Sequence, residues 1–199
     1  VDALSTNHYV LLDNFLENKE ANALRELFEL KLRNEEFKKA GIGDSELKVI
    51  DETIRGDKIH WLEKNSNSLL IKSFLNKIEE VMNLLNRYCF LSLSDYEFHF
   101  AHYPPGAFYK RHLDQFKGDK NRLISVVFYM NNNWLSDDAG QLRIHLEKSH
   151  IDIEPIFNRL VLFKSDLIEH EVLKTNVHRY SVTGWMLFRK MGLEIMDAN

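Results

Sequence analysis

The sequence predicts an α+β fold in which helices from the first half of the chain cover a β-sheet formed by the second half. Apolar residues recur at helical spacing in two segments before residue 90, and short β-rich runs follow from about residue 96. We expect one domain over 1–199, with helical support and a loop region in 1–95 and the sheet core in 96–190.

The bulk composition narrows the function classes. With 44% hydrophobic and 28% charged residues among 199, the chain is of ordinary globular type. Its net charge is -4 and its lysines and arginines are scattered, so nucleic acid is not an expected partner. The single cysteine, Cys89, rules out an intramolecular disulfide framework, and no membrane span or signal peptide is visible. These features favour the cytoplasm.

The first half of the chain predicts one strand and two helices. The strand covers 8–12, and Asn18 is a candidate cap for a helix that ends at Lys38, Lys39 and Gly41. The segment 41–65 lacks a sustained period, which indicates a long ordered loop or irregular strands. A second helix is expected from Ser66 or Ser68. The apolar faces of the two helices comprise Ala21, Leu24, Phe28 and Leu32, and then Leu70, Phe74, Ile78, Val81, Met82 and Leu85.

The second half predicts strands whose two faces differ. The expected strands are 96–103, 108–113, 122–131, 141–146, 159–164 and 178–188. In the last of these, alternation puts Arg179, Ser181, Thr183 and Trp185 on one face and Tyr180, Val182, Met186 and Phe188 on the other. In the first, Glu97, His99, Ala101 and Tyr103 oppose Tyr96, Phe98 and Phe100. This pattern predicts either a polar face that lines a cavity or a sheet with one solvated side.

A metal site is predicted from three residues. His112 and Asp114 lie at i and i+2 of a strand end, so both side chains point the same way while Leu113 points into the core. With His170 they would form the two-histidine, one-carboxylate facial triad of non-haem iron(II) oxygenases. Taken singly, each histidine would more often be a surface or hydrogen-bonded structural residue. A second His-x-Asp pair, His150 and Asp152, lies among loop-like charged residues and too close to His170 to share a barrel site with it.

A carboxylate-binding group is predicted beside the metal. Arg179 begins the last strand on its inward face, where an unpaired guanidinium would be costly. The distal carboxylate of 2-oxoglutarate would satisfy it, and an internal salt bridge to Glu97 or Asp166 is the alternative. Tyr129 and Tyr103 face inward by parity and would donate hydroxyl hydrogen bonds to the cosubstrate, unless they are core tyrosines.

Several ordered motifs resemble one family. They are IRGDKIHWLE at 54–63, HYPPGAFYKRHLD at 102–114, VVFYMNNNW at 126–134, GQLRIH at 140–145, DIEPIFNRLVLFKSD at 152–166, HEV at 170–172 and RYSVTGW at 179–185. From about Arg55 to Phe188 the chain is similar to the prolyl 4-hydroxylases of the 2-oxoglutarate oxygenase superfamily, in the branch of the hypoxia-inducible-factor prolyl hydroxylases and their bacterial relatives.

The resemblance implies a fold and a set of roles. The fold would be a double-stranded β-helix, or jelly-roll, with N-terminal helices packed on one sheet. The iron ligands would be His112, Asp114 and His170, with 2-oxoglutarate held by Arg179, Tyr129, Tyr103 and Thr183. The segment Arg55 to Trp61 would be a mobile loop over the substrate, with Asp57 paired to Arg122, and Trp185 would line the pocket. The alternative is a fixed surface loop with an incidental ion pair.

The implied activity is hydroxylation of a prolyl residue in a protein substrate, coupled to conversion of 2-oxoglutarate and O2 to succinate and carbon dioxide. Ascorbate would support turnover, and elongation factor Tu is one candidate substrate. The segment between Asp114 and Arg122 is one residue longer than in the animal enzymes and the turn after Tyr103 one shorter, which leaves the substrate open. Alternatives are the same chemistry on lysine, a small amino acid or an alkylated base, a non-catalytic β-barrel binding or sensor module, and a zinc hydrolase.

Overall fold

The computed structural model describes residues 2–41, 50–115 and 121–188. The helices are α1 (Asp2–Asn7), α2 (Asn18–Arg33), α3 (Leu69–Cys89) and a short 3-10 turn, Ser136–Asp138. The strands are β1 (Tyr9–Asp13), β2 (Lys38–Lys39), β3 (Lys58–Leu62), β4 (Asp95–Tyr103), β5 (Tyr109–His112), β6 (Arg122–Tyr129), β7 (Leu142–His145), β8 (His150–Ile153), β9 (Arg159–Lys164), β10 (Glu169–Val172) and β11 (Arg179–Leu187).

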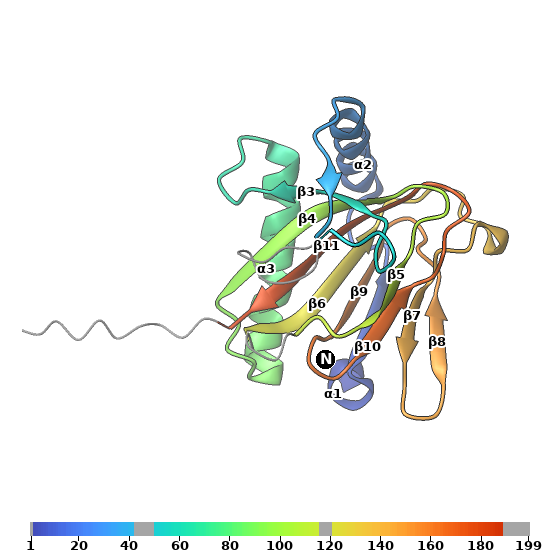
Figure 1. Ribbon diagram of the computed structural model, residues 1–199. Coiled ribbons are helices and arrows are strands. Elements are labelled where there is room, and N and C mark those ends of the chain that lie inside the picture. Colours follow the sequence, from blue (N-terminus) through green and yellow to red (C-terminus); the bar gives the residue numbers. More distant parts are fainter. Residues whose placement is uncertain (1, 42–49, 116–120, 189–199) are drawn as a thin grey trace, which may run out of the picture.

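The described strands form two antiparallel sheets. The large sheet has the order β1-β9-β6-β11-β4-β3-β2, and the small sheet has the order β5-β10-β7-β8. Helices α2 and α3 lie together on one side of the large sheet, while the small sheet lies on its other side (Figure 1). The predicted α+β class, with antiparallel sheets and helices on one sheet, is therefore confirmed.

Each face of the large sheet packs into its own apolar cluster. On the helix side, Phe28 of α2 and Phe74 of α3 pack with Phe98, Phe100 and Met186. On the opposite side, strand residues of the large sheet pack against the small sheet, among them Ala101, Tyr103, Val127, Leu142 and Ile144. The alternation read from the sequence thus separates a helix-covered face from an inward face, as predicted, and the inward face meets the small sheet instead of water.

The second helix begins where the sequence indicates. Ser68 is the cap residue of α3, and its side chain accepts a hydrogen bond from the backbone N–H of Ile71 at 3.5 Å. The helix ends at Cys89, because the next residue, Phe90, adopts a left-handed conformation (φ 54°) that stops further α-helical hydrogen bonding.

Three expectations about local structure are wrong. Helix α2 ends at Arg33, because Glu35 adopts a positive φ of 58°, and the two lysines expected to end it form strand β2 against Lys58 and Ile59. The residue at the α2 N-cap is Glu17, so Asn18 is already helical. His150–Ile153 is strand β8 and not a loop; it was overlooked because its charged side chains face outward at a sheet edge.

No helix in the described ranges has the length and apolar character needed to cross a bilayer.

Candidate metal centre

The three predicted ligands meet between the two sheets. His112 ends β5, and the register of the small sheet sets it directly opposite His170 of β10 although the two residues are far apart in the chain. Nε2 of His112 lies 3.4 Å from Oδ1 of Asp114, and Nε2 of His170 lies 3.6 Å from Oδ2 of the same residue. The three ligand atoms fall within 4.8 Å of one another, a spacing that one metal ion can bridge.

Backbone carbonyls fix the orientation of both imidazoles. Nδ1 of His112 is 2.7 Å from the carbonyl oxygen of Lys110, and Nδ1 of His170 is 3.2 Å from that of Ile168. A carbonyl oxygen only accepts hydrogen bonds, so each Nδ1 carries the proton and donates it. Each Nε2 therefore presents its lone pair toward Asp114, which is the tautomer that a metal ligand needs.

The charges of the site also suit a divalent cation. Burial lowers the pKa of His170 to about 4, so this imidazole is neutral near neutral pH. Burial alone would raise the pKa of Asp114, but His170, His112 and the hydroxyl of Ser125 together hold it well below its usual range. The carboxylate is thus ionised in a buried position, where a metal ion would compensate its charge.

Asp114 has a supporting shell that the sequence did not reveal. The hydroxyl of Ser125 on β6 donates to Oδ2 of Asp114 at 2.6 Å, and the hydroxyl of Ser165 lies 2.8 Å from that of Ser125. Both serines are buried. Ser125 falls on the inward face of a predicted strand, which was the available signal, but serines in strands are too common to identify such a role.

Leu113 does not point into the core as predicted. Strand β5 stops at His112, so the alternation that would have buried the next side chain no longer applies. Leu113 is 37% exposed and lines the cavity beside the ligands.

A cavity of about 100 Å³ extends from the ligands along the inward face of the large sheet. Most of the predicted site residues line it. Besides the three ligands they are Arg55, Trp61, Tyr103, Arg122, Arg179, Thr183 and Trp185. Tyr129 and Asp57 do not line this cavity; both are buried behind its wall.

Arg179 is the most deeply buried charge of this cavity. It is 1% exposed, its Nε donates to the carbonyl oxygen of Gly140 at 2.9 Å, and its guanidinium carbon lies about 5 Å from the rings of both Tyr103 and Tyr129. Within 2–41, 50–115 and 121–188 no carboxylate pairs with it. The proposed alternative partner Glu97 is bound to Arg122 instead.

Tyr103 and Tyr129 are two candidate hydroxyl donors near Arg179, since the guanidinium carbon is about 5 Å from both rings. Burial raises the pKa of Tyr103 and of Tyr129, so both hydroxyls keep their protons and are available as donors. The hydroxyl of Tyr129 is fully buried beside the Arg179 guanidinium, whose charge and hydrogen bond partly offset the effect of burial on the Tyr129 pKa. A buried guanidinium and the protonated hydroxyl of Tyr103, which line the same cavity as three candidate metal ligands, would suit a small dicarboxylate such as 2-oxoglutarate.

The expected ion pair between Asp57 and Arg122 is not formed. Asp57 accepts two hydrogen bonds from Arg55, at 2.8 and 2.6 Å, and Arg122 is bound to Glu97 at 2.7 Å with its guanidinium carbon 3.6 Å from the Trp185 ring. Glu97 lies on the inward face of β4 within reach of Arg122, and Asp57 is held in the interior by an arginine only two residues away. Each charge therefore takes a nearer partner than the resemblance implies.

Two further residues of the cavity were not singled out as site residues. His99, placed on the inward face by parity, packs its ring 4.9 Å from that of Trp61. Tyr109 stacks on the ligand His112, with ring centroids 3.7 Å apart. Strict alternation puts residues 109 and 112 on opposite faces, but the β5–β10 register shifts between His170 and Val172, and this irregularity turns both rings to the same side.

Comparison with known proteins agrees with this geometry. The profile of the 2OG-Fe(II) oxygenase superfamily matches residues 98–187. The mouse prolyl hydroxylase EGLN3 is 32% identical over 188 residues, which are 89% of this chain and 77% of the mouse protein. The crystal structure of a Pseudomonas putida prolyl-4-hydroxylase superposes with a TM-score of 0.86 at 36% identity and covers 94% of this chain and 96% of that one.

A structure with bound peptide is also similar. It is a Trichoplax adhaerens prolyl hydroxylase in complex with a hypoxia inducible factor oxygen degradation domain peptide fragment. Its TM-score is 0.82 at 29% identity, over 94% of this chain and 86% of that one. With the ligand triad, a buried arginine that pairs with no carboxylate of the described residues and the relatives in agreement, the chain belongs to the prolyl hydroxylase family of 2OG-Fe(II) oxygenases.

Proposed function

We propose that this protein is an iron(II)- and 2-oxoglutarate-dependent prolyl 4-hydroxylase that acts on a prolyl residue of another protein. The observation that carries the proposal is the placement of Arg179. A buried guanidinium with no carboxylate partner in the described residues shares one cavity with a preoriented His-Asp-His triad. That combination suits an enzyme that binds a metal and a dicarboxylate side by side.

Iron would be held by His112, Asp114 and His170, and 2-oxoglutarate by Arg179, Tyr129, Tyr103 and Thr183. The bound pair would supply O2 activation, coupled to decarboxylation of 2-oxoglutarate to succinate. We further assign the whole chain to one double-stranded β-helix domain with its N-terminal helices as support. The antiparallel order of the two sheets and the position of the cavity between them support this assignment.

Other residues of the chain would orient the cosubstrate, exclude water and contact the substrate. Arg179 orients the cosubstrate through its distal carboxylate, and its bond to the Gly140 carbonyl fixes the guanidinium plane. Trp61, which is 40% exposed, and Trp185, covered by Arg122, flank the cavity and would exclude water and contact the prolyl ring. The segment from Arg55 to Trp61 would lie against the substrate.

A substrate in protein form is supported by the relatives, since the Trichoplax enzyme was solved with a peptide fragment bound. Elongation factor Tu, which the resemblance to bacterial relatives implies, is our first candidate. Ascorbate would keep the iron reduced between turnovers.

The test is a proteome digest treated with the protein, iron(II), 2-oxoglutarate, O2 and ascorbate. Mass spectrometry should detect prolyl residues that have gained one oxygen atom, together with a stoichiometric amount of succinate. Asp114→Ala and Arg179→Met should abolish the signal, whereas Arg143→Met, which removes an exposed ion pair on the small sheet, should not.

Other outcomes separate the rival functions. Succinate release with free lysine, a small amino acid or an alkylated base, without formation of hydroxyproline, would show that the proposed oxygenase chemistry is right. The substrate would then not be a prolyl residue. Binding of 2-oxoglutarate with no turnover on any substrate would instead favour the sensor module and overturn the proposal.

A further inference from the structure

One metal ligand is covered by a stack of two side chains. The Tyr109 ring lies nearly parallel to that of His112, at an interplanar angle of 19° and a centroid separation of 3.7 Å. The guanidinium carbon of Arg55 lies 4.2 Å from the centroid of the same tyrosine. Two groups at these distances cannot share one face of a ring, so Tyr109 is sandwiched between a cation and the imidazole.

The outer layer of this stack is itself anchored in the interior. Arg55 donates two hydrogen bonds to Asp57, whose side chain is fully buried, and a third to the carbonyl oxygen of Gly41 at 3.2 Å. The Arg55 side chain is only 12% exposed. The guanidinium therefore cannot swing away from Tyr109 without leaving a buried carboxylate unpaired, which is strongly unfavourable.

His112 is the ligand that needs such support. Its side chain is 18% exposed, compared with 7% for His170. His170 is packed against the buried ring of Phe163, at 4.6 Å, whereas His112 ends an edge strand of the small sheet. His112 also contacts the other two ligands, with its ring centroid 4.3 Å from that of His170 and its Nε2 3.4 Å from Asp114. The face contact with Tyr109 adds to these contacts and to the Nδ1 bond a restraint on rotation of the His112 ring.

We propose that Tyr109 and Arg55 are positioning residues for the iron ligand His112, and that Asp57 acts on the metal site through them. The inference rests on the metal site of the proposed function. According to it, the Arg55–Asp57 segment supports a metal ligand in addition to its proposed contact with substrate. Loss of the stack should weaken metal binding before any substrate or cosubstrate is present.

The test measures Mn(II) binding to the metal-free protein by the electron paramagnetic resonance signal of the free ion. Tyr109→Leu should raise the Mn(II) Kd by about tenfold or more, in the range typical for loss of a group that orients a ligand. Tyr109→Phe keeps the ring face and should stay within about twofold of the unmodified protein. The double variant Arg55→Met/Asp57→Asn removes both charges together and should raise the Kd about fivefold.

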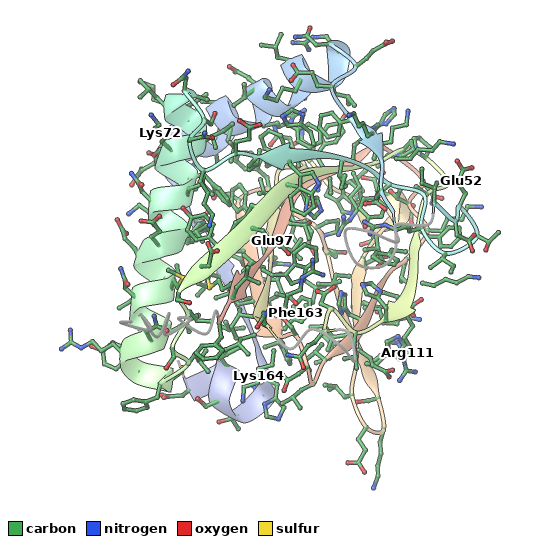
Figure 2. The ribbon with its side chains drawn as sticks, turned by 60° about the vertical axis from the view of Figure 1, so that its left-hand side comes forward. Glu52, Lys72, Glu97, Arg111, Phe163 and Lys164 are labelled. Atoms are coloured by element: carbon green, nitrogen blue, oxygen red, sulfur yellow. The ribbon has the colours of Figure 1, made fainter. Side chains whose placement is uncertain are left out.

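Arg111→Met is the matched control. Arg111 is next to the ligand in β5, but its side chain is half exposed, points away from the interior (Figure 2) and pairs with Glu169. Its loss should leave the Mn(II) Kd unchanged. Melting temperatures of the metal-free variants report on folding separately, and if the double variant is unfolded, the two Tyr109 variants decide the question.

Two results would overturn the inference. One is an unchanged Mn(II) Kd in Tyr109→Leu, and the other is a Tyr109→Phe variant as weak as Tyr109→Leu, which would assign the effect to the hydroxyl and not to the stack. Either leaves the proposed function standing as long as the unmodified protein binds Mn(II). Absence of Mn(II) binding in the unmodified protein would remove the metal site, and the proposed function with it.

Discussion

Ser125 donates a 2.6 Å hydrogen bond to Asp114, and the bond fixes the direction of the only carboxylate among the three metal ligands. Because the hydroxyl proton of Ser125 points to Asp114, the 2.8 Å contact with Ser165 requires Ser165 to donate to Ser125. The two serines thus form a directed chain that ends on Oδ2. Such a chain orders the carboxylate and strengthens its last hydrogen bond.

Replacing Ser125 by alanine should therefore weaken metal binding. We expect the Mn(II) Kd to rise about tenfold, because Asp114 loses the donor that holds its plane. Ser165→Ala removes only the second bond of the chain and should have a smaller effect. Equal Mn(II) affinities for Ser125→Ala and the unmodified protein would show that His112 and His170 suffice to orient the carboxylate.

The ion pair between Arg55 and Asp57 predicts a specific pattern of stabilities. Asp57→Asn leaves a guanidinium in a largely buried position without its counter-charge, and we expect the free energy of unfolding to fall by about 3 kcal/mol. Arg55→Met/Asp57→Asn should cost less than Asp57→Asn alone, since no charge is left unpaired. The coupling is measured by urea unfolding of four proteins in a double-mutant cycle. They are the unmodified protein, Arg55→Met, Asp57→Asn and the double variant. A double variant that loses the sum of the two single effects would contradict the buried pair.

For comparison, Arg122 and Glu97 form a pair that is partly open to solvent, with side chains 21% and 34% exposed. Glu97→Gln should change the free energy of unfolding by less than about 1 kcal/mol. The family resemblance had implied a different pair, between Asp57 and Arg122. A resemblance carries over which residues are charged, but the choice among several charges near one cavity depends on distances of a few ångströms.

Much of the site could be predicted because it depends on strand periodicity. Alternation alone put Arg179, Thr183 and Trp185 on one face, and the cavity is lined by that face. The failures came where periodicity is interrupted. Tyr109 was missed because of the register shift in β5, and Leu113 was misplaced because its strand had already ended. The early end of α2 depends on a positive φ at Glu35, which glutamate rarely adopts and no local signal indicates.

The histidines predict how stability depends on pH. Burial lowers the pKa of His170 and of His102 to about 4 each, from about 6.5 in the unfolded chain. Between pH 6.5 and 4 both imidazoles are protonated in the unfolded chain and neutral in the folded one, so the unfolded state binds more protons. The free energy of unfolding of the metal-free protein should therefore decrease as the pH falls through this window, and these two groups should add no further loss below it.

His102→Gln isolates one of the two contributions. His102 lies on the helix side of the large sheet, 2.9 Å from Nδ1 of His178 and away from the ligands. Removal of His102 should reduce the slope of the free energy of unfolding against pH by up to about 1.4 kcal/mol per pH unit, the value for one proton. Urea unfolding at several pH values gives the slope directly. A slope that is the same in His102→Gln and in the unmodified protein would mean that His102 titrates alike in both states.

Gly140 links Arg179, the proposed cosubstrate anchor, to the backbone. It adopts a φ of 69°, and its carbonyl oxygen receives the hydrogen bond from Nε of Arg179. A Cβ atom at this position would lie 2.9 Å from both Cβ and Oγ1 of Thr175 and 3.3 Å from Cδ of Arg179. Thr175 is fully buried and bonded to the carbonyl of Val177, so it cannot easily yield.

Gly140→Ala should therefore displace Arg179 and raise the KM for 2-oxoglutarate, while kcat at saturating cosubstrate changes little because the metal ligands stay in place. We expect a rise of about tenfold, the equivalent of one weakened charged hydrogen bond. Gly106→Ala is the control: it has a φ of 88°, so the backbone strain is similar, but its Cβ would meet nothing closer than 3.8 Å, at Cε of Lys174. If both variants raised the KM equally, strain in the loops and not contact with Arg179 would be the cause, and the role of Gly140 as a support for the cosubstrate anchor would be wrong.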